Sequence, residues 1–508
     1  MSIILKVDNN VTYIEGRLDS KIYKELKKEL GYLPEGSFWM IKKNSDNSKE
    51  KWKKDWDGYV TTVCWNKQSC RCHVKKSGTH FQSGLLSKAC NFFKNNGIQY
   101  GIKDIRKKTE KTDNYSMSEE FESRDYQEEI IDKITKGKGI ERGIVKMSTG
   151  SGKTPVACGI IAGIGVIPVV FYVPSISILK QAKDEIEKFV RCNNIPVKVG
   201  MVGGGEKDIQ DITVMTIQTA VRALGGVWVK FDDEDINKDD TDIDDIKDKI
   251  INLIQNCRLM FIDECHHCAS ETCQIISDSS ISCQYKFGIS ATPTRDLGDD
   301  ILIDACFGKT IVDINASFLI KKGYLVKPHI YFCTISNMRG KTNKKTYQTI
   351  YKEAIVENDI RNQKIIDFAN YFNETGRKTL VLVKQVAHGK FLESMIPGSV
   401  FVHGSSPKKK REEHLEKMRN EWQGVTIATV IMDEGINCKP LDTLILAGSG
   451  KSSSRALQRI GRILRPYPGK KDAIVVDFLD RCKYLESHSK KREKIYKSEE
   501  EFVIERPK

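Results

Sequence analysis

The stretch Met147-Ser-Thr-Gly-Ser-Gly-Lys-Thr154 decides the fold of the chain around it. It lies between two apolar runs, 143–147 and 155–162, in the order strand, glycine-rich turn and helix start. Backbone N–H groups in such a turn attract phosphate oxygens, Lys153 can reach the β- and γ-phosphates, and the Thr154 hydroxyl can hold Mg²⁺. Met147 stands where the G-x-x-x-x-G-K-[ST] pattern has its first glycine. The stretch predicts a phosphate-binding loop; a plain Gly/Ser loop between two buried elements is the alternative.

Bulk composition indicates a soluble protein with several domains. At 508 residues the chain is too long for one core, and two to four domains are expected. Hydrophobic residues make up 39% and charged residues 30%, and no run of 18 apolar residues predicts a membrane span. The chain begins without an export signal, and its 15 cysteines show no regular pairing. We therefore expect reduced thiols in a cytoplasmic protein.

The formal net charge of +14 favours a polyanionic partner, although a merely solvated basic surface would give the same total. Its distribution is uneven. Residues 51–100 carry nine Lys or Arg against two Asp or Glu, whereas residues 231–249 carry ten acids against three lysines. The basic excess is concentrated, which favours a contact surface. The acidic stretch 231–249 is expected to form an exposed loop or helix.

Residues 1–117 have the pattern of a small α+β module that ends in a linker. Residues 3–7 and 11–15 alternate like the strands of a hairpin, and residues 20–30 have helical spacing. Residues 103–119 are polar and charged, which is typical of a linker.

Lysines interleave with aromatic residues over 51–76, and Lys53 and Lys54 are among them. Such a mixture suits nucleic acid, because phosphates pair with cations and bases stack on rings. The alternative is that the tryptophans are core residues and the lysines only solvated. Two groups of potential zinc ligands have spacings that match no recognised site: Cys64, Cys70, Cys72 and His73, and His266 with His267.

From about residue 118, apolar strand-like runs alternate with helical segments, which is typical of a parallel, doubly wound sheet. A second such series begins near residue 326 without a phosphate loop. We predict an α/β fold with two tandem doubly wound parallel-sheet domains, 118–325 and 326–484. Residues 485–508 predict a charged tail with a solvated helix face. The predicted strands are 169–173, 212–216, 259–262, 286–290, 380–383, 400–402, 425–428, 443–446 and 473–476.

Two further groups of side chains suit phosphate chemistry. Asp263 and Glu264 follow an apolar strand, where open α/β sheets place their ligands. Asp263 can hold Mg²⁺, and Glu264 can orient or deprotonate a water molecule. Gln458, Arg462 and Arg465 recur at i, i+4 and i+7, on one face of a predicted helix. Two aligned guanidiniums suit a γ-phosphate, and a solvated basic helix face is the alternative.

Taken in order, these motifs resemble those of the superfamily 2 helicases over residues 120–480. The resemblance departs in two places, at Met147 and at Asn437, where Asp is usual. The elements that carry it are 124–127 (adenine reading), 147–154 (motif I), 173–175 (Ia), 203–205 (Ib), 216–219 (Ic), 263–266 (the D-E-x-H box), 290–292 (III), 403–405 with Arg411 (IVa), 428–437 (V) and 458–465 (VI).

The resemblance implies two RecA-like domains that bind ATP and Mg²⁺ between them. It assigns catalysis to Lys153, Asp263, Glu264, Arg462 and Arg465. It assigns nucleotide binding to Arg124, Gln127, Gly150, Ser151, Gly152, Lys153, Thr154, Gly435 and Gln458, with Thr154 and Asp263 on the Mg²⁺. It assigns coupling between nucleotide and nucleic acid to His266, Ser290 and Thr292. It assigns nucleic-acid contacts to Pro174, Ser175, Gly204, Thr216, Gln218, Thr219, Gly404 and Thr429, to which the N-terminal module adds Lys53 and Lys54.

Within the family the chain most resembles the phage UvsW type, with XPB-like and RecG-like branch processors further off. The likeness rests on the Asp-Glu-Cys-His box, on Gln-Arg-Ile-Gly-Arg and on residues 54–58 and 81–86. It implies a monomeric ATP-dependent DNA helicase or translocase on branched or double-stranded DNA, in recombination, replication or repair. The alternatives are an RNA helicase, the motor subunit of a restriction or transcription-release assembly, and an inactive binding module. The last is disfavoured because every ATP-handling residue is present.

Overall fold

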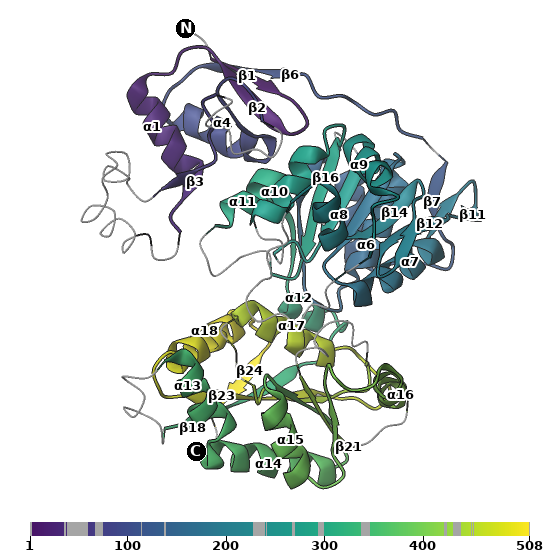
Figure 1. Cartoon of the computed structure of the whole chain (residues 1–508), viewed down its shortest axis with the longest axis vertical. Coiled ribbons are helices and arrows are strands. Elements are labelled where there is room, and N and C mark those ends of the chain that lie inside the picture. The colour runs from purple at the N-terminus through teal and green to yellow at the C-terminus, as the bar shows by residue number, and fades with distance from the viewer. Residues whose placement is uncertain are drawn as a thin grey trace. The chain divides into compact units, whose positions relative to one another are not determined.

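The computed structural model of the chain forms two compact units, with the main boundary between them at Asp313 and Ile314, and residues 148–151 are assigned to the second unit (Figure 1). The structure describes residues 3–34, 37, 59–66, 75–112, 114–136, 139–226, 239, 241–266, 270–292, 299–336, 346–420, 424–429, 438–448, 450 and 452–506. Some residues singled out in the sequence lie outside these ranges: Lys53, Lys54, Cys70, Cys72, His73, His267, Gly435 and part of the acidic stretch 231–249.

The first unit begins with a small α+β module. Its elements are β1 (Ile3–Val7), β2 (Val11–Glu15), α1 (Ser20–Glu29), β3 (Gly31–Tyr32), β4 (Val60–Thr61), β5 (His80–Gln82), η1 (Ser83–Leu85), α4 (Leu86–Asn95) and β6 (Tyr100–Asp104). β1 and β2 form the predicted antiparallel hairpin, and β6 lies parallel to β1 in the sheet order β5-β2-β1-β6. Leu26 and Phe93, on the apolar faces of α1 and α4, are buried with Leu5 in the core of this module.

The main part of the first unit is an eight-stranded sheet with helices. Its elements are β7 (Tyr115–Met117), α5 (Asp125–Thr135), β8 (Arg142–Met147), α6 (Lys153–Ile164), β9 (Val169–Val173), α7 (Ile176–Phe189), β10 (Val190–Cys192), β11 (Ile195–Pro196), β12 (Val199–Gly203), β13 (Glu206–Asp208), β14 (Ile212–Thr216), α8 (Ile217–Ala223), α9 (Lys247–Asn256), β15 (Leu259–Asp263), α10 (Ser270–Ser279), β16 (Tyr285–Ser290), α11 (Ile301–Phe307) and β17 (Thr310–Ile314). The sheet order is β13-β12-β14-β9-β15-β16-β8-β17, and the strands from β12 to β8 are parallel.

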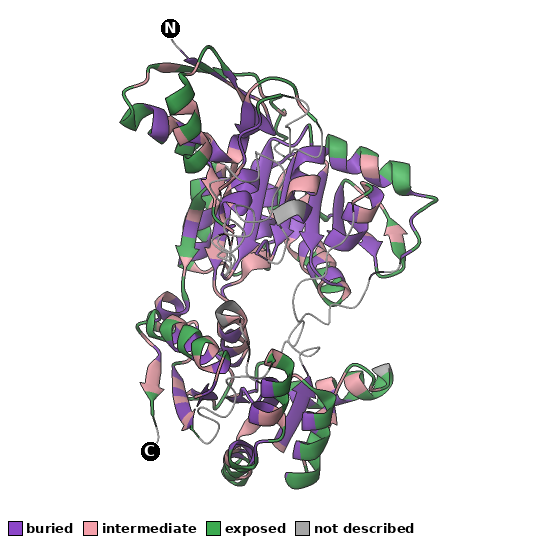
Figure 2. Ribbon diagram, turned by 60° about the vertical axis from the view of Figure 1, so that its left-hand side comes forward, coloured by how far each residue is buried: buried purple, intermediate pink, exposed green. Residues whose placement is uncertain are grey.

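The inner strands of this sheet are continuous apolar runs because helices cover both faces. Figure 2 shows these strands buried from end to end. Phe171, Phe261 and Phe287 lie side by side on β9, β15 and β16, with 5.6 Å between neighbouring ring centroids. Their packing fixes the centre of the sheet.

The N-terminal module packs on the main part of the first unit through α11. Ile301, Leu302 and Ala305 of that helix belong to the hydrophobic core of the module. At Gly84 the approach is so close that an added Cβ would lie 2.2 Å from the carbonyl oxygen of Asp304. The two parts therefore share one core.

A buried polar seam reinforces this contact. The Lys286 ammonium, on β16, donates to Asn10 Oδ1 at 2.5 Å and to the Ser277 carbonyl at 2.8 Å. Asn10 Nδ2 donates to the Asp278 carbonyl at 2.8 Å. Burial lowers the pKa of Lys286, so these acceptors have to compensate the cost of placing an ammonium inside the protein.

Several residues of the stretch 103–119 bond to the main part of the first unit, so the stretch is not the free linker that its composition predicts. The Thr109 N–H donates to Gln284 Oε1 at 2.7 Å, and the Thr112 N–H donates to the Gly165 carbonyl at 2.8 Å. β7 then pairs antiparallel with β10. Composition misleads here because polar side chains can face solvent while the backbone bonds to a neighbouring element. The predicted domain boundaries stay predictions.

The second unit contains a seven-stranded sheet in the order β20-β21-β19-β22-β23-β18-β24. Its elements are α12 (Ala316–Lys321), β18 (Pro328–Ile335), α13 (Tyr347–Tyr351), η2 (Lys352–Val356), α14 (Asp359–Glu374), β19 (Lys378–Val383), α15 (Val386–Met395), β20 (Val400–Val402), α16 (Lys408–Arg419), β21 (Gly424–Thr429), β22 (Thr443–Ile445), α17 (Ser453–Ile463), β23 (Ala473–Asp480), α18 (Leu485–Lys497) and β24 (Val503–Glu505). All its pairings are parallel. Each strand predicted from the sequence is present, and the predicted α/β fold class is confirmed.

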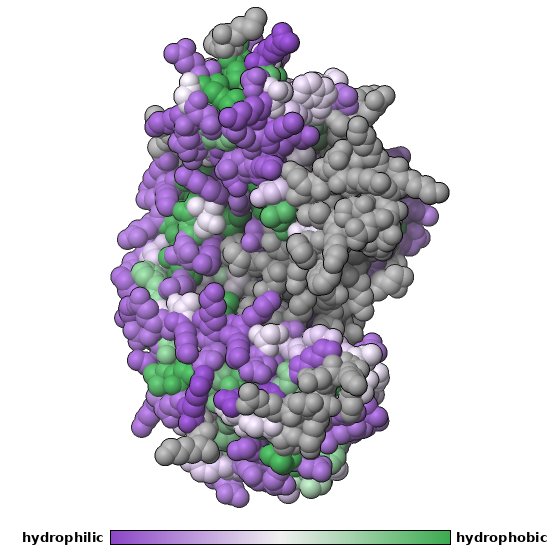
Figure 3. All heavy atoms as spheres, turned by 90° about the vertical axis from the view of Figure 1, so that its left-hand side faces the viewer, coloured by the Kyte–Doolittle hydropathy of each residue, from purple (hydrophilic) through white to green (hydrophobic). Residues whose placement is uncertain are grey.

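The surface drawn in Figure 3 is mainly hydrophilic, with hydrophobic side chains in small separate patches. Within the described ranges, no helix combines the length and the apolar character needed to cross a membrane.

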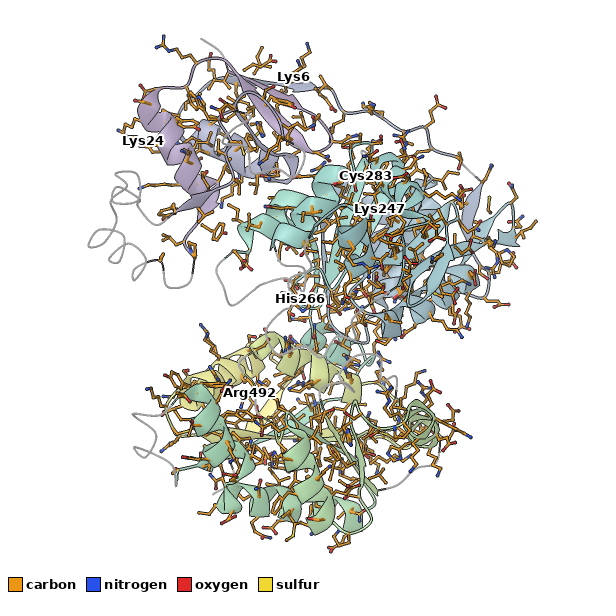
Figure 4. All side chains as sticks on the ribbon, viewed as in Figure 1. Lys6, Lys24, Lys247, His266, Cys283 and Arg492 are labelled. Atoms are coloured by element: carbon orange, nitrogen blue, oxygen red, sulfur yellow. The ribbon has the colours of Figure 1, made fainter. Side chains whose placement is uncertain are left out.

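Residues 485–506 are an integral part of the second unit, which corrects the prediction that 485–508 form a charged tail. Helix α18 exists, but it buries Arg492 (labelled in Figure 4), whose Nε donates to Asp477 Oδ2 at 2.8 Å. The Tyr496 hydroxyl donates to the same carboxylate oxygen at 2.8 Å. Burial lowers the pKa of Arg492, but Asp477 more than offsets burial, and the pKa is raised. β24 then joins the sheet beside β18. Because Lys and Glu residues alternate along this helix, the sequence did not indicate that one of its faces is buried.

We expect Arg492→Ala to destabilise the second unit by about 3–5 kcal/mol, because Asp477 would keep a buried charge without its partner. Lys490→Ala, on the exposed side of the same helix, removes only a surface ion pair with Glu486 and should cost less than about 1 kcal/mol. Denaturant unfolding of both variants measures the difference. Equal stability of the two variants would show that the Arg492–Asp477 pair does not hold α18 in place.

Candidate functional site

The predicted functional residues of the first unit gather at one edge of its sheet. Neighbouring parallel strands end at the same edge, and ligands of open α/β sheets bind there. The phosphate loop follows β8, the predicted acidic pair lies at the end of β15, and the predicted coupling residues Ser290 and Thr292 lie at the end of β16, between those two strands in the sheet. The residues predicted to bind nucleic acid follow β12, β14 and β9, which are adjacent to each other and to β15.

The phosphate loop leaves β8 at Met147 and enters α6 at Lys153. Met147 is the last residue of β8 and is fully buried, so the position needs no glycine. Gly150 and Gly152 have φ of 86° and 81°, in the left-handed region that glycine adopts without strain. The loop thus has the glycines where the backbone requires them.

Gln127 lies against this loop. Its Oε1 accepts from the Arg124 N–H at 3.0 Å and caps α5. Its Nε2 faces Gly152, where an added Cβ would lie 2.3 Å away. The Arg124 guanidinium donates to the Tyr126 hydroxyl at 3.0 Å. The element predicted to read adenine is therefore in contact with the phosphate loop.

Lys153 and the acidic pair meet at the sheet edge. The Lys153 ammonium forms an ion pair with Glu264. Burial lowers the pKa of Lys153, but the Glu264 and Asp263 carboxylates more than offset burial, and the pKa is raised. Asp263 Oδ1 accepts from the Glu264 N–H at 2.9 Å. Lys153 therefore carries its positive charge beside two carboxylates.

A hydrogen-bonded group links the acidic pair to the end of the next strand. His266 Nδ1 and Ser290 Oγ lie 2.6 Å apart, and each lies 3.5 Å from Glu264 Oε2. The Thr292 N–H donates to Ser290 Oγ at 3.0 Å. His266 is labelled in Figure 4. Of the three residues predicted to couple the two sites, His266 and Ser290 thus contact each other and Glu264, and Thr292 contacts Ser290.

The residues predicted to bind nucleic acid surround a carboxylate that the sequence did not single out. Pro174 and Ser175 connect β9 to α7, and Gly204 follows β12. Thr216, Gln218 and Thr219 lie at the end of β14 and in α8. Gly204, Thr216, Gln218 and Thr219 all hydrogen-bond to Asp239.

Asp239 corrects the prediction of an exposed acidic stretch. Its exposed fraction is 2%, and Ile243 and Ile246 of the same stretch join the core of the first unit. The prediction came from the overall composition of the stretch, which does not show whether a single acid is buried. Nothing in the sequence distinguishes Asp239 from the other nine acids.

In the second unit, Gly404 follows β20, and Thr429 is the last residue of the neighbouring strand β21. Gln458 and Arg462 lie on α17, but that helix ends at Ile463, so Arg465 lies beyond it. The predicted single helix face for Gln458, Arg462 and Arg465 is therefore wrong for its last member.

Two further observations concern metals and thiols. In the described part of the chain, no group of three or more His, Cys, Asp or Glu could hold a metal ion. The cysteines described there are free thiols, as their irregular spacing predicts.

The chain matches two protein families. Residues 120–295 match the family described as "Type III restriction enzyme, res subunit", and residues 349–467 match the "Helicase conserved C-terminal domain". These matches occur in the order expected from the motifs. The chain belongs to the superfamily 2 helicases. These helicase domains imply that it uses ATP.

Individual proteins that are similar to this chain have names that describe helicases or a translocase. The chain is 25% identical over 403 residues to the DNA 3'-5' translocase XPB2 of Sulfurisphaera tokodaii, covering 72% of this chain and 82% of that protein. It is 26% identical over 231 residues to the ATP-dependent DNA helicase uvsW of Enterobacteria phage T4, covering 45% and 46%. It is 26% identical over 388 residues to a protein designated helicase 22 of Sulfolobus islandicus filamentous virus, covering 71% of this chain and 64% of that protein. The predicted UvsW-type and XPB-like resemblance is confirmed.

A solved structure shows the same fold. A fragment assigned as the HsdR subunit of a type I restriction enzyme from Vibrio vulnificus YJ016 superposes with a TM-score of 0.50 at 17% identity. The alignment covers 70% of this chain and 63% of that one.

We expect Gly152→Ala to weaken nucleotide binding by tenfold or more, about 1.4 kcal/mol, because the Cβ would meet Gln127 and the φ of 81° is strained for alanine. Gly376→Ala is the matched control: its φ is 73°, and nothing lies within 4 Å of the added Cβ. Titration with a fluorescent ATP analogue compares the two. Wild-type affinity in Gly152→Ala would contradict the loop assignment.

Proposed function

We propose that this chain is an ATP-dependent DNA helicase or translocase that acts on branched or double-stranded DNA. The observation that carries the proposal is the single sheet edge at which the phosphate-loop residues and the D-E-x-H residues lie beside the residues of motifs Ia, Ib and Ic. The name of the T4 relative describes an ATP-dependent DNA helicase and that of the archaeal relative a DNA translocase. Because the chain spans only part of these relatives, its activity and substrate are proposals.

The ion pair between Lys153 and Glu264 suggests how ATP engages the site. Phosphate oxygens are anionic like the Glu264 carboxylate, so they can replace it as the partner of Lys153. Glu264, released from the lysine, then orients or deprotonates the attacking water. Ser290 and His266 contact Glu264, and they would transmit this exchange toward the nucleic-acid residues.

The residues proposed for Mg²⁺ fit that ion. Thr154 supplies a hydroxyl in the first turn of α6, and Asp263 supplies a carboxylate at the end of β15. Oxygen donors of these kinds are the ligands that Mg²⁺ prefers. Bound there, the ion would neutralise charge on the phosphates.

The second unit contributes the other nucleotide residues of the proposal. Gln458 and Arg462 lie on α17, and Arg465 follows the helix. We assign both guanidiniums to the charge that develops on the γ-phosphate during hydrolysis, because they can bind phosphate oxygens in pairs.

The N-terminal module offers cations and rings for a DNA duplex or branch. Trp65 is 55% exposed and meets Tyr23 edge-on at 4.7 Å. Lys27 lies over the Tyr23 ring at 5.2 Å, and Lys28 over the Tyr59 ring at 5.5 Å. Such clusters can pair with phosphates and stack on bases. The predicted monomeric state stays a prediction, which light scattering of the full chain can test.

The proposal is tested by ATP hydrolysis with single-stranded, duplex, forked and four-way DNA and with structured RNA. Forked or four-way DNA should stimulate turnover most. Lys153→Ala should reduce hydrolysis by about 100-fold or more while DNA binding persists, because the lysine serves the phosphates. Lys146→Ala, which removes a lysine from β8 that pairs with Asp313, should retain activity. Stimulation by RNA alone would replace the DNA assignment with the RNA alternative.

Arg462→Ala should lower kcat by about 10³-fold or more and change nucleotide affinity little, because an arginine on the γ-phosphate acts mainly on the transition state. The control variant is Arg459→Ala, at a position on the same helix that lies outside the i, i+4 spacing of Gln458 and Arg462. Steady-state kinetics separates the two effects. A raised KM with unchanged kcat would make Arg462 a binding residue only.

A further inference from the structure

The carboxylate of Asp239 lies inside the proposed nucleic-acid site. Its Oδ2 accepts from the Thr216 hydroxyl at 2.5 Å and from the Thr219 hydroxyl at 2.9 Å. Its Oδ1 accepts from the Gly204 N–H at 3.1 Å. Three donors that belong to the proposed site therefore already hold one carboxylate of the protein.

Further contacts seat Asp239 firmly. Thr241 donates to Oδ1 from its N–H at 3.1 Å and from its hydroxyl at 2.6 Å. The Asp239 N–H donates to Gln218 Oε1 at 2.8 Å. Glycine at position 203 permits this approach, because an added Cβ there would lie 2.7 Å from Asp239 Oδ2. The Arg222 guanidinium also donates to the Asp239 carbonyl, so Asp239 is held by residues of the proposed site, by Arg222 and by Thr241 of its own stretch.

These donors are of the kind that proteins present to a nucleic-acid phosphate, namely hydroxyls and backbone N–H groups around an anion. Burial raises the pKa of Asp239, but hydrogen bonds from Thr216, Thr241, Thr219 and Gly204 more than offset burial, and the pKa is lowered. The carboxylate is therefore ionised. A phosphate oxygen on the same donors would bring a second negative charge into the same space, so the two anions exclude each other.

We infer that Asp239 is an internal competitor of nucleic acid, whose carboxylate occupies the donors of Gly204, Thr216 and Thr219 that a backbone phosphate of the bound strand would take. This inference rests on the proposed function. Nucleic acid binds only when Asp239 leaves, so the measured affinity is reduced by the fraction of molecules in which the donors are free. The exposed Asp242 and Asp244 add charge of the same sign.

The decisive variant is Asp239→Asn, which removes the charge and keeps the size. We expect its Kd for a labelled DNA oligonucleotide, measured by fluorescence anisotropy, to fall about tenfold. Its affinity for a fluorescent ATP analogue without DNA should not change, because Asp239 contacts no residue of the phosphate loop. Asp242→Asn is the matched control, since it makes the same change of net charge on an exposed residue three positions along. Its Kd should fall less than about twofold.

A purely structural role for Asp239 predicts the opposite result. If the carboxylate only holds the turn at Gly204, Asp239→Asn binds DNA more weakly than wild type, and the inference is overturned. Thr241→Val provides a second route: it removes a donor to Asp239 that belongs to the acidic stretch and frees the Gly205 N–H, which donates to the Thr241 hydroxyl at 2.8 Å, while Gly204, Thr216 and Thr219 keep their side chains. We expect Thr241→Val to tighten DNA binding about threefold. This variant tests the inference about Asp239 if Asp239→Asn fails to fold.

The remaining outcomes are also distinct. An unchanged Kd in both variants, with normal DNA binding by wild type, overturns the inference and leaves the helicase proposal standing. Failure of the wild-type chain to bind any DNA or RNA overturns the proposed function, and the inference with it.

Discussion

Parallel strand pairing is the constraint on which the whole first unit depends. It brings the ends of β8, β16, β15, β9, β14 and β12 to one edge in that spatial order. Residues as far apart in the sequence as Lys153 and Glu264 become neighbours there. Since β15 lies between the nucleotide strands and the nucleic-acid strands, a residue on its end can contact both groups. His266 follows β15, and its partner Ser290 ends the neighbouring strand β16.

Buried charges in this protein serve two different purposes. Lys286 and Arg492 are held by acceptors that no ligand would replace, and they join one element to another. Glu264 and Asp239 are different, because each carboxylate sits on donors suited to a phosphate oxygen. A carboxylate on such donors keeps them ordered and satisfied, and it also sets how strongly a ligand has to bind in order to replace it.

Much of the fold could be predicted because buried parallel strands are short apolar runs, and each predicted strand is present. The phosphate loop and the acidic pair could also be predicted, since the chemistry of each depends on residues that are close together in the sequence. Arg465 was misplaced because helical spacing does not reveal where a helix ends. The C-terminal helix was misjudged because its buried face includes Ser489, Arg492 and Glu493, which composition assigns to solvent.

Contacts between segments that are far apart in the sequence could not be predicted from the sequence. Asp239 is one acid among ten, and only the folded chain reveals that it lies under Thr216 and Thr219. The binding of residues 103–119 to the first unit depends on backbone groups, which every sequence contains. A pattern of side chains carries no information about such bonds.

The seam between the N-terminal module and α11 has a consequence for the evolution of this protein. Asn10 on one side fits Lys286 on the other, and Gly84 fits the backbone of α11 at Asp304, so a change at Asn10, Gly84 or Lys286 alone would be costly. Substitutions across the seam therefore have to occur in compensating pairs. Replacing the N-terminal module alone with that of a distant relative would remove the Asn10 acceptor and leave the Lys286 ammonium on β16 with the Ser277 oxygens, so the module and the surface that it packs on have to change together.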